Sequence, residues 1–87
     1  MNKKIVELLS FIKSSKYREK IIVFIADETK IPSEIAKGIR LSYTHTSKHL
    51  NALKKKKIVT CLNENAKRGR LYQLTKLGKE ILAILKK

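Results

Sequence analysis

The sequence predicts a mainly helical domain with one small β-hairpin, in the order helix, helix, helix, helix, strand, strand, helix. Three observations lead to this prediction. Apolar residues recur at helical spacing in several separate stretches. Two short apolar runs enclose a polar, glycine-containing segment, as the strands of a hairpin do. The length of 87 residues allows one domain with a single small core.

The N-terminal part should form two helices. The spacing predicts a first amphipathic helix over about residues 2–13, with an apolar stripe made of Ile5, Leu8, Leu9 and Ile12. Two serines then interrupt the pattern before a second helix over about residues 16–27. Its apolar face comprises Tyr17, Ile21, Phe24 and Ile25, and Ile22 and Val23 are apolar as well. We therefore expect the second helix to lie at the centre of the domain.

A short helix, a tight turn and a longer helix should follow. Pro32 suits the first position of a helix ending near Ile39, because the missing N–H has no partner there in any case. Ser33, or a residue just before it, could cap this helix. Arg40 and Leu41 then form the turn. Ser42 is a suitable N-cap for the next helix, expected over residues 43–56.

The helix expected over residues 43–56 has a distinct face for the core and a polar face. Thr46, Leu50 and Leu53 form one stripe, with His49 at its border. We expect His49 to be packed rather than exposed. The opposite, polar face carries Thr44, Lys48, Asn51 and Lys55, flanked by His45 and Ser47.

The hairpin and a last helix complete the chain. Residues 58–62 and 71–74 read as strands, and the polar segment 63–69 between them as a long hairpin loop. Thr75 can cap a final helix over about residues 76–86. Its inward-facing residues should be Leu77, Ile81, Ile84 and Leu85.

Charge points to a polyanionic partner. The formal net charge is +14, from 21 basic and 7 acidic residues. Between Glu34 and Glu80 the only acid is Glu64, so the positive charge gathers in the second half of the chain. Such a field attracts polyanions and speeds encounter with them.

Other compositional features set limits on the class of protein. The single cysteine, Cys61, cannot form an internal disulfide or a cysteine-based metal cage. No apolar run approaches the ~20 residues that span a bilayer. Since the N-terminus also lacks the apolar region of a signal peptide, we expect a cytoplasmic protein with no membrane partner.

On these residues the chain resembles the winged helix-turn-helix transcriptional regulators, in particular small archaeal versions related to the ArsR and MarR groups. The resemblance begins at Tyr17. It is carried by Ile31-Pro32-Ser33-Glu34-Ile35-Ala36, Leu41-Ser42, Thr46-Ser47-Lys48-His49-Leu50, Leu53, Ile58-Val59 and Ala66 to Gly78. With the length of the chain, it predicts a single domain over residues 1–87. Within it, 1–14 form an extra N-terminal helix, 32–56 the helix-turn-helix, 58–74 a wing of two to three strands and 76–87 the C-terminal helix.

Three positions depart from the family pattern. Arg40 stands in the turn where relatives often have glycine, and Thr46 replaces a usually aliphatic residue. The run 54–57 is Lys-Lys-Lys-Lys where many relatives have Glu-Glu-Lys-Gly. The lysine run favours a phosphate-binding face.

The resemblance implies sequence-specific binding of double-stranded DNA, with the helix after Ser42 in the major groove and the wing on the backbone or in the minor groove. The expected contacts from the recognition helix are Ser42, Tyr43, Thr44, His45, Ser47, Lys48 and Asn51. Those from the wing are Lys67, Arg68 and Arg70. Further contacts to the DNA backbone are expected from Lys37, Arg40, Lys54 and Lys55, although lysines at a helix end also complement the helix dipole.

A homodimer is the expected assembly. The apolar stripes of the terminal helices offer more surface than a minimal domain of this size needs, and relatives often pair through such helices. The predicted interface consists of Ile5, Leu8, Leu9, Ile12, Ile81, Ile84 and Leu85. In the alternative arrangement, both helices complete the core of a monomer.

Other functions remain open to different degrees. A sequence-tolerant chromatin or architectural protein would suit the charge, and a winged helix can also bind protein or RNA. An enzyme is disfavoured, because the chain has no phosphate-binding glycine loop and no Ser/His/acid constellation. A metal site is also disfavoured, because His45, His49 and Cys61 are too few ligands. We expect no cofactor and no metal.

Overall fold

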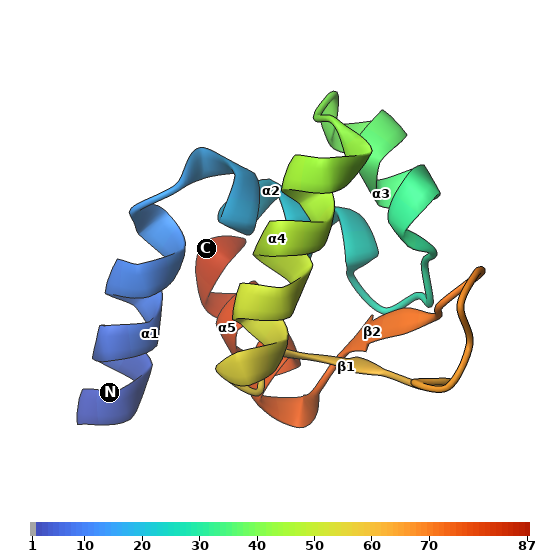
Figure 1. The fold of residues 1–87 in the computed structure, drawn as a ribbon. Helices are drawn as coiled ribbons and strands as arrows, with labels where there is room; N and C mark the ends of the chain where they lie inside the picture. The colour runs from blue at the N-terminus through green and yellow to red at the C-terminus, as the bar shows by residue number, and fades with distance from the viewer. Residues whose placement is uncertain (1) are drawn as a thin grey trace.

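The computed structural model describes residues 2–87 and confirms the predicted fold, five helices with one antiparallel hairpin (Figure 1). Met1, the first residue of the predicted domain, lies outside the described residues. The helices and strands are α1 Lys3–Lys13, α2 Lys16–Ile25, α3 Pro32–Ile39, α4 Tyr43–Lys55, β1 Val59–Cys61, β2 Tyr72–Leu74 and α5 Lys76–Leu85.

Helix α2 lies at the centre, as its composition predicts. It contacts α1, α3, α4, α5 and β2. Ile21, Ile22 and Ile25 are fully buried in the single core, but Val23 is 46% exposed, so this apolar residue does not belong to the buried face. The helix ends at Ile25, two residues before the expected end, because Ala26 leaves the helical region with a φ of 49°.

Helix α1 is fastened to the rest of the domain near the serines that separate it from α2. The Arg18 guanidinium donates from Nη1 to the Phe11 carbonyl oxygen at 2.7 Å and to Ser14 Oγ at 2.8 Å. The same guanidinium lies 4.1 Å from the centre of the Phe11 ring, and Lys56 Nζ lies 5.3 Å from it. Cations of α2 and of the end of α4 thus hold the last turns of α1.

The helix-turn-helix is fixed by local backbone contacts. At the start of α3 the Ile31 N–H donates to Glu34 Oε1 at 3.1 Å, so Ile31 and not Ser33 occupies the N-cap position. The turn needs a left-handed residue, and Arg40 adopts it with φ 58° and ψ 52°. The Leu41 N–H then donates to the Ala36 carbonyl oxygen at 3.0 Å, which closes the end of α3.

The hairpin is short and is anchored at its base. Thr60 pairs with Gln73 at the middle of the antiparallel register. A one-residue bridge between Lys30 and Tyr72 adds the beginning of a third strand, with N–H to O distances of 2.9 and 2.8 Å. At the base, Thr75 Oγ1 donates to the Lys57 carbonyl oxygen at 2.6 Å and accepts from the Gly78 N–H at 3.0 Å.

Several element ends differ slightly from the expected ones. Regular strand pairing covers only residues 59–61 and 72–74, although longer runs are apolar. One more backbone hydrogen bond, from the Leu62 N–H to the Leu71 carbonyl oxygen at 2.8 Å, joins these two exposed residues where the wing loop begins. Helices α4 and α5 each end one residue earlier than expected, at Lys55 and Leu85.

The residues predicted for a dimer interface are divided between core and surface. Ile5, Leu8, Ile12 and Ile81 are buried within the one chain. The three others, Leu9, Ile84 and Leu85, are only half-buried, and the neighbouring Val6 is exposed. The apolar stripes of α1 and α5 therefore complete the core of the single chain and leave a smaller apolar margin on its surface.

Candidate nucleic-acid interface

Helix α4 divides its surface into a buried stripe and two polar strips. Leu50, Leu53 and Thr46 face the core, and the Thr46 side chain is 0% exposed. Its Oγ1 atom has no hydrogen-bond partner among the described residues. The stripe fixes how the helix is rotated, and this rotation decides which polar residues face outward.

One polar strip faces the wing. Tyr43, Ser47 and Asn51, four residues apart, line a cleft of about 150 Å³ between α4 and the hairpin. Lys67 and Arg70 line the opposite side of the same cleft. Hydroxyl and amide groups thus face two cations across a space large enough for a small anionic group.

The other polar strip points away from the body of the domain. Thr44, Lys48 and Lys55 are exposed on it. At the start of the helix, Ser42 Oγ accepts from the His45 N–H at 3.2 Å, which confirms the predicted N-cap. The His45 ring nitrogen Nδ1 lies 3.0 Å from the same oxygen. The Ser42 hydroxyl is therefore engaged in capping α4. The Thr44 and Lys48 side chains form no hydrogen bond or ion pair with the other described residues.

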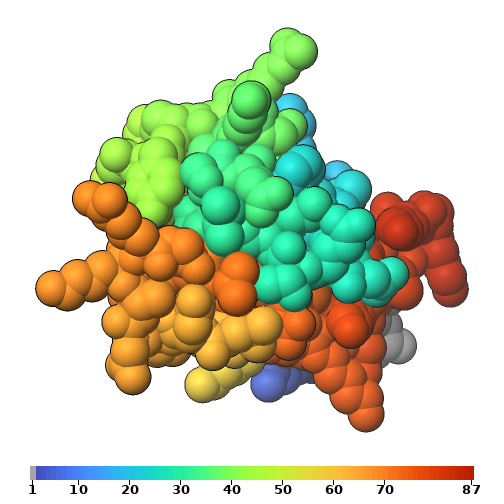
Figure 2. Space-filling model, turned by 90° about the vertical axis from the view of Figure 1, so that its right-hand side faces the viewer, coloured from blue at the N-terminus to red at the C-terminus, as the bar shows by residue number. Residues whose placement is uncertain are grey.

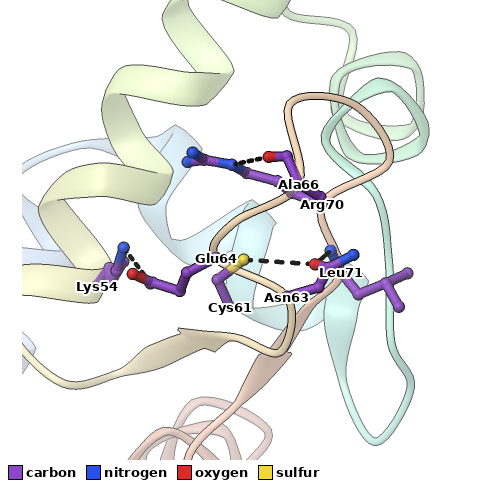
Figure 3. A network of polar contacts seen from close by, with 7 residues as sticks. All are labelled: Lys54, Cys61, Asn63, Glu64, Ala66, Arg70 and Leu71. Atoms are coloured by element: carbon purple, nitrogen blue, oxygen red, sulfur yellow. Dashed lines mark hydrogen bonds and ion pairs between the residues drawn. The ribbon is translucent and has the colours of Figure 1, made fainter.

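Two side chains, Asn63 and Arg70, hold the wing loop in shape (Figure 3). Asn63 Oδ1 accepts from the Leu71 N–H at 2.7 Å and from Cys61 Sγ at 3.6 Å. Asn63 Nδ2 donates to the Gly69 carbonyl oxygen at 3.2 Å. We refer to these three contacts as the Asn63 clip. Across the loop, Arg70 Nε donates to the Ala66 carbonyl oxygen at 2.9 Å. The clip closes both ends of the loop that carries the basic residues.

One ion pair joins α4 to the wing. Lys54 Nζ pairs with Glu64 Oε1, and both side chains remain partly exposed, at 35% and 55%. The hydrogen bond from Lys54, with the charges of Lys54 and Arg70, lowers the pKa of the Glu64 carboxyl. The same bond raises the pKa of the Lys54 ammonium. Lys54, expected on the DNA backbone, is thus held by a carboxylate of its own chain.

The remaining predicted contacts are exposed, and most share a face of the molecule. Lys37, Arg40, Lys67 and Arg68 are exposed, whereas Arg70 is half-buried by the wing. Figure 2 shows the start of α4 (yellow-green) beside the wing (orange), with α3 (green) next to both. Helix α4 and the wing therefore lie side by side on this face.

His49 lies half-buried beside α2, with its ring 6.2 Å from that of Tyr17. Burial, together with the charges of Arg18 and His45, lowers the pKa of its imidazole. In residues 2–87 no three His, Cys, Asp or Glu side chains gather closely enough to hold a metal ion. No helix in this part of the chain is both long and apolar enough to cross a bilayer.

Sequence reasoning missed the residues that shape the wing. The sequence predicts Asn63 and Glu64 only as loop residues, although both make contacts that shape the wing. It predicts Tyr72 only as a strand residue, although Tyr72 lines the cleft together with Pro32. The isolation of Glu64 among basic residues is visible in the sequence and could have drawn attention to it. Its partner could not have been identified, because the contact joins two elements of the fold.

Comparison with known proteins agrees with this architecture. A family model described as "Winged helix-turn-helix" matches residues 18–87, from the first turn of α2 to the end of the chain. No curated protein sequence matches the chain.

Solved structures with the same fold have low sequence identity to the chain. HlyU from Vibrio cholerae has a TM-score of 0.79 and 20% identity, with 98% of this chain and 94% of that chain covered. TubR bound to 24 bp of tubC from Bacillus thuringiensis has a TM-score of 0.77 and 21% identity, covering 99% and 94%. A ZitR mutant from Lactococcus lactis has a TM-score of 0.73 and 19% identity, covering 83% of this chain. The chain spans 50% of the ZitR length.

Proposed function

Since the chain belongs to the winged helix-turn-helix family, we propose that it binds double-stranded DNA sequence-specifically as a transcriptional regulator. The observation that carries this proposal is the shared polar face of α4 and the wing, which is rich in basic residues and poor in acids. A major groove about 12 Å wide accommodates one helix, and the outer strip of α4 is free to enter it.

The two strips of α4 suggest different roles for the predicted contacts. Thr44 and Lys48 lie on the outward strip, where they can reach base edges, and a lysine can donate to guanine O6 and N7. Tyr43, Ser47 and Asn51 face Lys67 and Arg70 across the cleft. This second group suits a backbone phosphate, since it combines two cations with neutral hydrogen-bonding groups.

The remaining basic residues act around this centre. Arg68, at the exposed tip of the wing, is placed to reach the backbone or a narrow minor groove. Lys37, Arg40 and Lys55 contribute backbone contacts or long-range attraction. His45, at the first turn of α4, lies beside the groove-facing residues.

A homodimer is part of the proposal, with the terminal helices at the interface. The partly exposed Leu9, Ile84 and Leu85 and the exposed Val6 provide the apolar margin for it. Two copies would address half-sites about one helical turn apart. TubR, similar in fold, has been seen bound to 24 bp of its tubC DNA, which suits a duplex partner here.

The finer relationship, to archaeal regulators of the ArsR and MarR groups, rests on the motifs from Ile31 to Gly78 and belongs to the same proposal. So does a cytoplasmic location, where DNA is accessible to a regulator. We propose no enzymatic activity and no cofactor for this domain.

A fluorescence-anisotropy titration tests the proposed function. The duplex from upstream of the protein's own gene is compared with a shuffled duplex of equal length, at about 150 mM salt. A regulator of its own gene should prefer the native duplex by about 10³-fold or more. Equally tight binding to both would instead support a chromatin-like role, and binding to neither would redirect the search to a protein or RNA partner.

A further inference from the structure

The one acid between Glu34 and Glu80 is paired with the recognition helix. Glu64 stands alone between Glu34 and Glu80, and its carboxylate meets Lys54 at the last turn of α4. The Asn63 clip holds the backbone next to Glu64, which keeps the Glu64 carboxylate close to the end of α4. The ion pair therefore links two parts of the proposed DNA-binding face.

Lys54 lies on the strip of α4 that faces the wing. It follows Tyr43, Ser47 and Asn51 at intervals of four, four and three residues, so its side chain lies on the same side of the helix. Lys54 and Glu64 line a second hollow, which shares Asn51 with the cleft between α4 and the wing. Without Glu64, the Lys54 ammonium would be an unpaired cation beside that hollow. With Glu64 in place, the ammonium is paired and the two charges cancel.

We propose that Glu64 limits the affinity of this protein for any duplex, by pairing with Lys54 and withholding that cation from the phosphate backbone. The inference rests on the proposed DNA binding and deepens it. The Glu64 carboxylate occupies the place on the Lys54 ammonium that a phosphate oxygen would take.

The physical consequence is a smaller sequence-independent component of binding. Non-specific affinity comes almost entirely from phosphate contacts and the release of counterions. Each contact steepens the slope of log K against log salt by about 0.9. A protein with this excess of basic residues would otherwise bind every duplex tightly. Withholding one cation reduces binding to all sequences, so base contacts decide a larger share of the difference between sites.

A double-mutant cycle on a random-sequence duplex tests the inference without knowledge of the operator. Glu64→Gln should steepen the slope of log K against log salt by about 0.9 and raise affinity about fivefold near 150 mM salt, as one extra phosphate contact does. In the Lys54→Gln background, the same Glu64→Gln change should leave the slope unaltered, because no ammonium remains to be released.

Glu80→Gln is the matched control, since it removes an equal charge from the exposed side of α5. It should leave the slope close to that of the wild type. If Glu80→Gln matches Glu64→Gln, or if Glu64→Gln steepens the slope equally without Lys54, net charge alone is responsible and the inference is overturned. Wild-type protein that binds no duplex at all would overturn the proposed function, and the inference with it.

Discussion

The helix-turn-helix and the wing of this molecule are held by different kinds of contact. In the helix-turn-helix, the cap of α4, the start of α3 and the left-handed turn at Arg40 all use backbone groups within five residues of each other. In the wing, Asn63 reaches Leu71, Lys54 reaches Glu64, and Thr75 reaches Lys57. One half of the proposed interface is therefore built from local sequence, and the other depends on the finished fold.

The largest expected effect comes from replacing one glycine in each of the two regions by alanine. An added Cβ at Gly78 would meet the Ile58 carbonyl oxygen at the base of the hairpin, and backbone cannot move aside. An added Cβ at Gly38 in α3 would meet the ring of Phe24, a half-buried side chain that can rotate. Gly78→Ala should cost about 3 kcal/mol of unfolding free energy, and Gly38→Ala about 1 kcal/mol or less. Urea denaturation measures both, and equal costs would contradict the distinction.

DNA binding should divide along the same line. Lys48→Ala, on the outward strip of α4, should weaken a preferred duplex about 10- to 100-fold and a random duplex much less. Arg68→Ala, at the wing tip, should weaken both duplexes alike and reduce the salt slope by about 0.9. Anisotropy titrations at several salt concentrations give both quantities. If each change affects the two duplexes equally, helix and wing do not divide the work in this way.

The two helix caps offer a third comparison. Ser42→Ala removes the oxygen that accepts from the His45 N–H and lies 3.0 Å from His45 Nδ1, an exposed contact that adds little, so it should cost about 1 kcal/mol. Thr75→Ala removes a similar cap at Gly78 and also the bond to the Lys57 carbonyl oxygen, so it should cost about 2 kcal/mol. Denaturation curves of the two variants decide the matter, and a cost for Ser42→Ala equal to that of Thr75→Ala would show that the second bond adds nothing.

Within the helix-turn-helix, we expect Thr46 to lower the free energy of unfolding. Its buried hydroxyl has no partner, whereas Val has the same shape and no polar group. Thr46→Val should therefore raise the free energy of unfolding by about 1 kcal/mol. The control is Thr60→Val on the half-exposed middle of β1, which should be nearly neutral. A loss of stability in Thr46→Val would mean that the hydroxyl is satisfied in solution.

The smallest effects are the pH dependences, which should occupy separate windows in the two regions. The pKa of His49 lies below its ordinary value of 6.5, so its contribution is complete above pH 6.5 and is lost as pH falls from 6.5 to the lowered pKa. The pKa of Glu64 lies below 4.5, so its contribution is lost only on further acidification. Melting temperatures across pH should lose the first component in His49→Gln and the second in Glu64→Gln. If His49→Gln lost the component at acidic pH and Glu64→Gln the one just below pH 6.5, this assignment would be refuted.

The same difference explains what the sequence could predict. The bounds of α3, the turn at Arg40 and the cap at Ser42 follow from short-range rules, and the structure agrees with them. The predicted hairpin strands are longer than the observed ones, because where a strand ends depends on its partner strand and not on apolar character alone. The partners of Asn63 lie at the other end of the same loop, and Lys54, the partner of Glu64, lies on α4, so neither follows from a short-range pattern.

The terminal helices show another limit of sequence reasoning. An apolar stripe predicts burial but not the partner that buries it. Ile5, Leu8, Ile12 and Ile81 fit an interface between two copies as well as they fit the core of one chain, and in the structure they are buried within one chain. Only the packing of α1 and α5 against the domain separates the two uses.

The Asn63 clip also has a consequence for the thermodynamics of association. A wing that is disordered in the free protein must be ordered on DNA, and the lost entropy opposes binding while coupled folding adds a large negative heat-capacity change. In this chain the loop ends are already tied by Leu71 and Gly69 before any ligand arrives. Calorimetry of complex formation should therefore show a heat-capacity change that matches the contact area alone, with no component from folding of the wing.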